Sequence, residues 1–246
     1  MAKTLIIIPS RMGATRLPGK PLLKINNLSI ISHVFKRAEE ANIGEVVVAT
    51  DDQEILNDVL KNKGKAILTN KNHKTGTDRI FEAYEKLNIK NVDYILNLQG
   101  DEPDIDKEDI INLNNFMINQ DAELGTLAAK IQDDKMLNNE NVVKVITDKK
   151  LVGGNFPTAL NFTRDNLVTA SQNIYHHIGI YSYKVRVLKK FISLDQTHNE
   201  KKNRLEQLRA LDNKLKINVA LAKSSPIGVD TEEDYLAIKK IMEYKR

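Results

Sequence analysis

Apolar and polar positions alternate over roughly the first hundred residues in a way that predicts strands and helices in turn. Short, largely β-branched runs predict strands at Thr4–Ile8, Val46–Ala49, Ala66–Leu68 and Tyr94–Leu98. Apolar residues then recur on one helical face from Ile30 to Ala41, and Ser29 is placed to cap that helix. Further helices are expected after Asp52 and from about Thr77. This alternation is typical of βαβ units and predicts an α/β fold with a mostly parallel sheet and flanking helices.

The pattern loosens over about residues 125–179. Asn- and Asp-rich stretches surround the apolar run Val142–Ile146, and Gly153, Gly154 and Pro157 break any long helix there. We therefore expect a single domain over residues 1–246, with an insertion at about 125–179 that could act as a dimerisation arm.

Regular elements return toward the C-terminus. Strands are expected at Ile178–Tyr183 and Ile217–Ala222, with a short helix at Leu205–Leu211 between them. A closing helix is expected after Thr231, whose spacing to Asp234 suits a variant of the capping box.

Composition narrows the class of protein. Apolar residues make up 41% of the 246 residues, which is sufficient for a buried core. The formal charge of +4 is spread over interspersed lysines and carboxylates, so we expect solvated faces and no nucleic-acid partner. The absence of cysteine excludes disulfides and thiolate catalysis. No segment approaches the roughly twenty apolar residues of a membrane span, so we expect a cytoplasmic protein without a membrane partner.

The stretch "IIIPSRMGATRLPGKPLL" places Arg11, Arg16 and Lys20 in a Gly- and Pro-marked loop directly after the first predicted strand. Open parallel sheets bind ligands beyond the carboxyl ends of their strands, so this loop indicates a ligand site. Its glycines are spaced wrongly for a Walker loop, and its prolines prevent the early helix of a dinucleotide fingerprint. What remains is a loop whose amides and cations can cradle a polyanion such as a nucleoside triphosphate, or a surface loop with incidental charge.

Carboxylates form a second group of candidate functional residues. In "LQGDEPDI", a predicted strand ends in Asp101, Glu102 and Asp104, which are oxygen ligands suited to Mg²⁺. Asp230, in "GVDTEEDY", comes just before the closing helix, where it could equally complement the helix dipole. If Asp101 and Asp230 converge on the cationic loop, they make a site for metal-assisted phosphoryl or nucleotidyl transfer.

These stretches, in this order, resemble the 3-deoxy-manno-octulosonate (Kdo) cytidylyltransferase family. The resemblance covers nearly the whole chain through the blocks "PSRMGATRLPGKPL", "VVVATDD", "TGTDR", "LQGDEP", "HHIGIYSY", "LEQLRAL" and "GVDTEEDY". It implies a GT-A-like nucleotidyltransferase fold with a dimerisation arm, and a homodimer. It also implies the reaction of CTP with Kdo to give CMP-Kdo and pyrophosphate for lipopolysaccharide synthesis, with Mg²⁺ as cofactor.

The resemblance also assigns residues of the nucleotide half. Arg11 and Lys20 would bind the triphosphate and take part in catalysis, with Ser10 and Arg16 assisting. Thr75, Gly76 and Thr77 would line the cytosine pocket and Arg79 would brace it, although Thr77 could instead simply cap a helix. Asp101 and Asp230 would hold the catalytic metal.

The sugar acid would be bound by Gln99, Arg164, His177, Tyr181, Glu206 and Gln207, with Arg164 suited to the C1 carboxylate. Each also has a plainer interpretation: His177 as a hydrogen-bonded core histidine, Tyr181 as strand packing, and Glu206 with Arg209 as an exposed helix pair.

The sequence departs from the family pattern on the sugar side. Asn161, Thr163 and Val168 stand where the family has an aromatic residue, Ser and Pro, and "NEKKNR" replaces an acidic stretch. An 8-amino variant of the sugar therefore stays open, because one altered hydrogen-bond partner can change selectivity by orders of magnitude. A sialic-acid-type cytidylyltransferase and a non-catalytic, nucleotide-binding regulatory homologue stay open as well.

Overall fold

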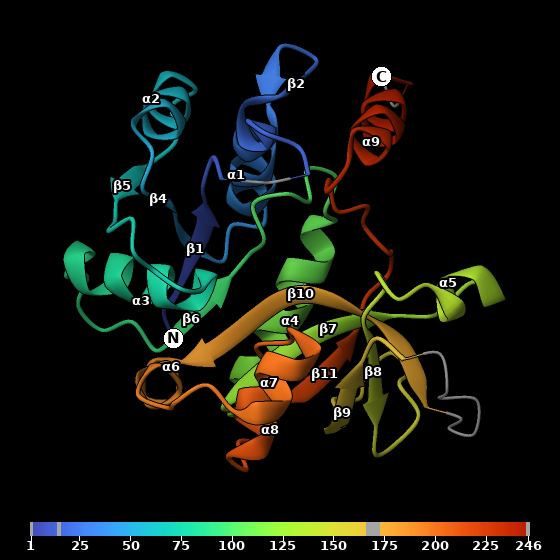
Figure 1. Ribbon diagram of the computed structural model, residues 1–246. Coiled ribbons are helices and arrows are strands. Elements are labelled where there is room, and N and C mark those ends of the chain that lie inside the picture. The colour runs from blue at the N-terminus through green and yellow to red at the C-terminus, as the bar shows by residue number, and fades with distance from the viewer. Residues whose placement is uncertain (1, 14–15, 166–172, 245–246) are drawn as a thin grey trace. The chain divides into compact units, whose positions relative to one another are not determined.

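The chain folds into two compact units. The computed structural model describes residues 2–13, 16–165 and 173–244. The first unit contains residues 1–111 and 226–246, and the second contains residues 112–225 (Figure 1). Helix α4 (Lys107–Asn119) runs across the boundary. Val168 lies outside the described residues.

A parallel sheet forms the centre of the first unit. Its strands are β1 (Thr4–Ser10), β4 (Gly44–Thr50), β5 (Ala66–Leu68) and β6 (Tyr94–Asn97). β1 pairs with β6 on one side and with β4 on the other, and β5 pairs with β4. All three pairings are parallel, and β1 and β6 are buried almost throughout. The four strands predicted from the apolar runs are confirmed.

The helices of the βαβ units start at side-chain caps. α1 (Ile30–Glu40) is capped by Ser29 and α2 (Gln53–Lys61) by Asp52, both as expected from the sequence. α3 (Gly76–Leu87) starts one residue earlier than expected, because Thr75, and not Thr77, is its cap. Thr75 forms a capping box with Asp78, so its hydroxyl and the Asp78 carboxylate each accept a backbone N–H.

The C-terminal segment belongs to the first unit. A short 3-10 helix (Lys20–Leu22) leads into a small hairpin of β2 (Lys24–Ile25) and β3 (Leu28–Ser29). Helix α9 (Glu232–Tyr244) packs against this hairpin through a cluster that includes the buried side chains of Ile25, Ile30, Val229 and Ile238. The Tyr235 hydroxyl donates to the carbonyl of Lys24 at 2.7 Å, which further ties α9 to the hairpin.

The second unit is built on antiparallel pairs. β7 (Leu124–Ala129) pairs antiparallel with β10 (Ile174–Lys184) and parallel with β11 (Asn218–Leu221). β8 (Lys144–Thr147) pairs with β10 and with β9 (Ala159–Thr163), both antiparallel. Residues 125–179, where we expected an insertion, thus contribute to four of its strands.

Short helices complete the second unit: α5 (Asp134–Asn138), α6 (Val185–Ile192), α7 (His198–Asn203) and α8 (Leu208–Asp212). The helix expected over Leu205–Leu211 is confirmed only in its second half, because Arg204 adopts a left-handed conformation that ends α7 (φ 53°) and α8 starts at Leu208. Among the described residues, no helix is both long enough and apolar enough to cross a membrane.

One glycine of the central sheet permits a close approach of two strands. Gly44 opens β4 opposite Thr4 of β1, and a β-carbon at this position would overlap the carbonyl oxygen of Thr4. We predict that Gly44→Ala lowers the free energy of unfolding by about 1–3 kcal/mol, because neither backbone can move without disturbing the parallel ladder. Denaturant titration measures the change. Gly153→Ala is the matched control, since a β-carbon there meets nothing within 4 Å, and an equal loss in both variants would contradict the explanation.

Candidate active site

The cationic loop leaves the carboxyl end of β1 and closes on a left-handed glycine. Gly19 (φ 72°) caps the 3-10 helix that carries Lys20, and Pro21 follows within its first turn. The backbone N–H of Lys20 donates to the carbonyl of Leu17 at 3.2 Å, which shapes the turn. A residue with a β-carbon would strain this conformation, so Gly19 lets the loop direct Lys20 back over the strand ends.

A cavity of about 400 Å³ lies beyond the carboxyl ends of β1 and β6, and all of its lining residues belong to the first unit. Of the residues predicted to bind nucleotide, metal or sugar, the lining includes Ser10, Arg11, Arg16, Lys20, Thr75, Gly76, Arg79, Gln99, Asp101 and Asp230. Thr77 is buried and is not among the lining residues. A volume of this size fits a small-molecule ligand.

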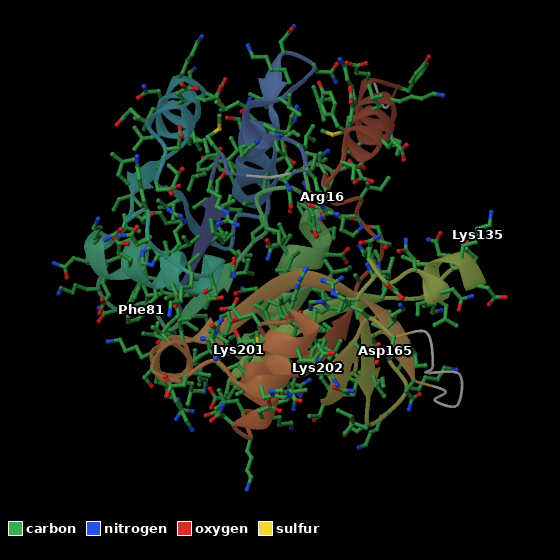
Figure 2. The ribbon with its side chains drawn as sticks, in the orientation of Figure 1. Arg16, Phe81, Lys135, Asp165, Lys201 and Lys202 are labelled. Atoms are coloured by element: carbon green, nitrogen blue, oxygen red, sulfur yellow. The ribbon has the colours of Figure 1, made fainter. Side chains whose placement is uncertain are left out.

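Lys20 joins the two predicted metal ligands. Its Nζ donates to Oδ2 of Asp101 at 2.8 Å and to Oδ1 of Asp230 at 3.2 Å. Arg16 contributes a second cation, with Nη2 2.9 Å from Oδ2 of Asp230 (Figure 2 labels Arg16). Burial acts to lower the pKa of Lys20, but the charges and hydrogen bonds of Asp101 and Asp230 outweigh it and raise that pKa above its ordinary value. Lys20 is therefore a fixed positive charge at the centre of the cavity.

A backbone hydrogen bond holds the two aspartates together. The N–H of Val229 donates to the carbonyl of Asp101 at 2.9 Å, and the Val229 side chain is fully buried in the cluster beneath α9. Asp230 is the next residue after Val229, so this hydrogen bond places it close to Asp101. The convergence expected from the sequence is thus present in the structure.

Glu102, next to Asp101, differs from the other acids of its stretch. Its side chain is buried, and Oε2 has no hydrogen-bond partner among the described residues. Burial, and then the neighbouring Asp101 charge, raise the pKa of Glu102 to about 8, so it is mostly protonated at neutral pH. Asp104, in contrast, lies 3.8 Å from Arg37. Only Asp101 of the three acids lines the cavity.

The start of α3 forms another wall of the cavity. Gly76 lies against Pro9 of β1, and a β-carbon at this position would come within 3.4 Å of Cγ of Pro9. Arg79 is 3% exposed, donates to Oγ1 of Thr69 at 2.6 Å and lies 3.3 Å from Asp51. It is therefore a buried brace of this wall.

The cavity also contains two residues that the sequence did not indicate. His73 and Lys74 line it just before the Thr75 cap of α3. Their position in the chain could have indicated them. They come directly before the residue that caps α3, at the edge of the parallel sheet where ligands bind.

The predicted sugar-binding residues other than Gln99 belong to the second unit, where two of them form one buried group. The Tyr181 hydroxyl lies 2.9 Å from Nε2 of His177, and the Thr126 hydroxyl lies 3.2 Å from the same nitrogen. Burial lowers the pKa of His177 to about 3, so the ring is neutral at physiological pH. His177 and Tyr181 are thus polar groups held in a set geometry, beyond simple strand packing.

Arg164 follows β9 and is tied to the preceding loop. Its guanidinium donates to the carbonyls of Glu140 and Asn141 at 3.1 and 3.2 Å. The ammonium of the buried Lys144 donates to the carbonyl of Arg164 at 3.1 Å. Asp165, labelled in Figure 2, is the next residue, and its N–H donates to the Thr163 hydroxyl at 3.0 Å.

Glu206 and Gln207 come directly before α8 and depend on a buried ion pair for their position. Arg209 of α8 makes two bonds to Glu200 of α7, at 2.8 and 2.6 Å, and also lies 3.6 Å from Glu206. The expectation of an exposed Glu206–Arg209 pair is wrong, because Arg209 is only 3% exposed. The lysines that replace the family's acidic stretch, Lys201 and Lys202, are exposed on α7 (Figure 2).

The residues present fit a magnesium ion that is completed by a nucleotide. Asp101 and Asp230 already share one cationic group, the Lys20 ammonium, so the cradle accepts a positive charge. No group of three His, Cys, Asp or Glu side chains suited to a metal occurs in the described part of the chain. Mg²⁺ is commonly held by one or two carboxylates together with phosphates and water, so two aspartates are sufficient only if the nucleotide supplies the rest.

The parallel sheet carries a cationic loop and paired carboxylates at its carboxyl edge, and the comparisons with known proteins place the chain among the nucleotidyltransferases. The cytidylyltransferase family model matches residues 5–217. A UDP-glucose pyrophosphorylase complexed with UDP-glucose shares the fold at 13% identity, with a TM-score of 0.71 and full coverage of both chains.

More similar proteins identify the particular family. The 3-deoxy-manno-octulosonate cytidylyltransferase of Thermodesulfovibrio yellowstonii is 44% identical and covers 97% of this chain and 98% of its own. That of Rhodopseudomonas palustris strain BisB18 is 42% identical, with 98% of both chains covered. A structure of CMP:2-keto-3-deoxy-manno-octonic acid synthetase complexed with CTP is 33% identical over 100% of both chains, with a TM-score of 0.90. The chain belongs to the 3-deoxy-manno-octulosonate cytidylyltransferase family.

The buried Glu200–Arg209 pair yields a prediction about stability. We predict that Glu200→Gln lowers the free energy of unfolding by about 3–5 kcal/mol, because it removes the charge that makes both short bonds to the buried Arg209 and leaves the more distant Glu206 at 3.6 Å. Glu45→Gln is the control: it breaks the Lys65–Glu45 pair, whose lysine is well exposed, and should cost less than about 1 kcal/mol. Denaturant titration of both variants checks this, and a small loss for Glu200→Gln would contradict it.

Proposed function

We propose that this protein transfers the cytidylyl group of CTP to the anomeric hydroxyl of a Kdo-type sugar acid, releasing pyrophosphate. The observation that carries the proposal is the single cavity that gathers Arg11, Arg16 and Lys20 with Asp101 and Asp230. Three cations suit a triphosphate, and two carboxylates suit the divalent ion that accompanies it. The names of the similar proteins support cytidine and Kdo as the substrates.

The reaction is a direct displacement at phosphorus. The oxygen of the sugar hydroxyl forms a bond to the α-phosphorus of CTP, the bond from that phosphorus to the bridging oxygen breaks, and the hydroxyl proton passes to solvent water. Pyrophosphate leaves with the electron pair. Because oxygen of the substrate is the nucleophile, the protein needs only to position the reactants and neutralise charge. The absence of cysteine is compatible with this chemistry.

The loop residues have distinct parts in this scheme. Lys20 is held extended into the cavity by the two aspartates, so its ammonium is placed in advance for a phosphate oxygen. Arg11 and Arg16 line the same cavity and add forked donors for the remaining phosphates, with Ser10 at the end of β1. Asp101 and Asp230 would hold Mg²⁺, which would neutralise the phosphates and make the attacking hydroxyl more acidic.

Base and sugar recognition are divided among other residues. The start of α3, at Thr75 and Gly76, offers the cytosine a narrow wall that Arg79 braces. Arg164 would bind the sugar carboxylate, and the neutral His177 with Tyr181 would exchange hydrogen bonds with sugar hydroxyls. Gln99, Glu206 and Gln207 complete the proposed sugar-binding set. The assembly we propose is a cytoplasmic homodimer that uses residues of about 125–179 as its arm.

The surroundings of Arg164 bear on the choice of sugar. Thr163, which stands in place of the family's Ser, is 7% exposed and accepts a hydrogen bond from the residue that follows Arg164. An altered hydroxyl this close to the proposed carboxylate ligand can change how the sugar acid is held, so the 8-amino sugar stays open as the second candidate substrate.

Pyrophosphate release tests base and sugar together. With CTP and Mg²⁺, we expect release with Kdo or with 8-amino-Kdo and much less with sialic acid. Replacing CTP by UTP should abolish most of the activity. Release with none of the three sugars, from protein that binds CTP, would contradict the proposed reaction and leave the regulatory homologue as the better interpretation.

The two aspartates are tested by isosteric replacement. We predict that Asp101→Asn and Asp230→Asn each lower turnover by roughly 100- to 1000-fold or more, because each removes a charged ligand of the divalent ion. Glu243→Gln, an exposed position on α9, should leave turnover unchanged. Activity with Mg²⁺ close to wild type in either aspartate variant would refute the metal assignment.

A further inference from the structure

Polar side chains on one face of α3 hold the segment that connects β5 to α3 (Figure 1). Arg79 donates to the hydroxyl of Thr69, and Lys86 donates to the carbonyl of Leu68 at 3.1 Å. Glu82 lies between these two cations on the helix and binds the middle of the segment. The connection is therefore fixed by side chains of the helix that it leads into.

Glu82 is the centre of this arrangement. Its two carboxylate oxygens accept the backbone N–H of Asn70 at 2.9 and 3.2 Å, and Oε1 lies 2.7 Å from the Lys86 ammonium. Oε2 also accepts a hydrogen bond from Nε2 of His73. Partial burial acts to raise the pKa of Glu82, but the bonds from Lys86, Asn70 and His73 lower it to about 2. Glu82 is thus ionised throughout the physiological range.

The bond to Glu82 sets the chemistry of His73. Since a carboxylate accepts and does not donate, Nε2 of His73 must carry the hydrogen. Nδ1 is then the ring nitrogen that can meet a ligand, and in the neutral ring it accepts from an O–H or N–H donor. His73 lines the cavity that contains Lys20 and Asp101, and its side chain is 19% exposed. The bond to Glu82 therefore fixes the orientation of the ring and the role of its second nitrogen at the wall of the cavity.

The position of His73 points to the nucleoside part of the ligand. The phosphates are served by the loop after β1, which brings Arg11, Arg16 and Lys20 to the cavity. His73 comes from the other wall, where it immediately precedes Lys74 and the Thr75 cap of α3. The nucleoside offers the donors that Nδ1 requires, namely the ribose hydroxyls and the amino group of cytosine.

We propose that His73 contacts the nucleoside of bound CTP and that Glu82 positions it for that contact. The proposal rests on the proposed function, because it takes CTP as the ligand of this cavity. It makes His73 a binding residue and Glu82 a positioning residue of the same site. A purely structural Glu82 would affect folding stability and leave nucleotide affinity unchanged.

Calorimetric titration without sugar tests the proposal. Wild type, His73→Ala, Glu82→Ala and Glu82→Gln are each titrated with CTP and with CMP in the presence of Mg²⁺. Lys86→Met is the matched control, because it removes another partner of the same carboxylate and leaves the His73 bond in place. Thermal unfolding of each variant separates loss of stability from loss of binding.

The expected pattern is specific. His73→Ala and Glu82→Ala should each weaken CTP binding by about tenfold, and CMP binding by the same factor, since the contact is to the shared nucleoside. Glu82→Gln should lose less, because its amide oxygen still accepts from His73, and Lys86→Met should stay within about twofold of wild type. Adding Glu82→Ala to His73→Ala should cost little more affinity than either change alone.

Three results would overturn the proposal. Unchanged affinity for CMP and CTP in His73→Ala, with wild type binding both, would show that His73 does not touch the nucleoside. A loss seen with CTP and absent with CMP would instead assign His73 to the β- and γ-phosphates, which CMP lacks. If wild type itself failed to bind CTP, the proposed function would fall and this inference with it. If Glu82→Ala does not fold, Glu82→Gln and His73→Ala carry the test.

Discussion

The active-site geometry depends on one ammonium group that is shared by two carboxylates from distant parts of the chain. Lys20 meets Asp101 at the end of β6 and Asp230 ahead of α9, and Arg16 adds a second charge to Asp230. Asp101 and Asp230, brought this close without a cation between them, would repel each other in a partly desolvated cavity. The loop after β1 therefore does two things at once: it stabilises the acidic pair, and it presents positive charge to an anionic substrate.

Apolar packing outside the cavity brings Asp101 and Asp230 together. The apolar cluster beneath α9 fixes Val229, whose N–H reaches the carbonyl of Asp101, and the next residue is then delivered to the cavity. Gly19, in its left-handed conformation, shapes the turn that carries Lys20, and α3 starts against Pro9. Each contact is local and modest. Together they place three cations and two carboxylates around about 400 Å³, and the first unit contains all of them.

The sequence predicts most of the first unit, because its signals are local. Apolar runs define the buried strands β1, β4, β5 and β6, and Ser29 and Asp52 start helices as expected. Thr77 was predicted to line the cytosine pocket, with a helix cap as the alternative, but Thr75 is the cap of α3; the local pattern distinguishes the two threonines, since only Thr75 has an acidic residue three positions later to complete a capping box. The loop cations and the aspartate pair follow from the topology of a parallel sheet.

Other features depend on pairings that a pattern does not display. His73 was missed because its importance arises from Glu82, which is nine residues away and reaches it only once α3 has formed. In the second unit, the apolar run Val142–Ile146 overlaps β8, although we expected it to belong to an insertion, and β9 carries an asparagine among its apolar residues and does not stand out from the loops around it. Arg209 of α8 is buried because it pairs with Glu200 of α7, and the sequence does not show that these two short helices lie together.

The delivery of Asp230 by the C-terminal segment has a consequence for biosynthesis. A nascent chain still held by the ribosome at Ile238 has already made the cationic loop and Asp101, but it cannot yet close the apolar cluster that anchors Val229. The same holds for a product truncated by a premature stop codon within α9. The placement of Asp230 at the cavity thus depends on a helix that is synthesised after it, so the last carboxylate of the site is supported only once translation has passed α9.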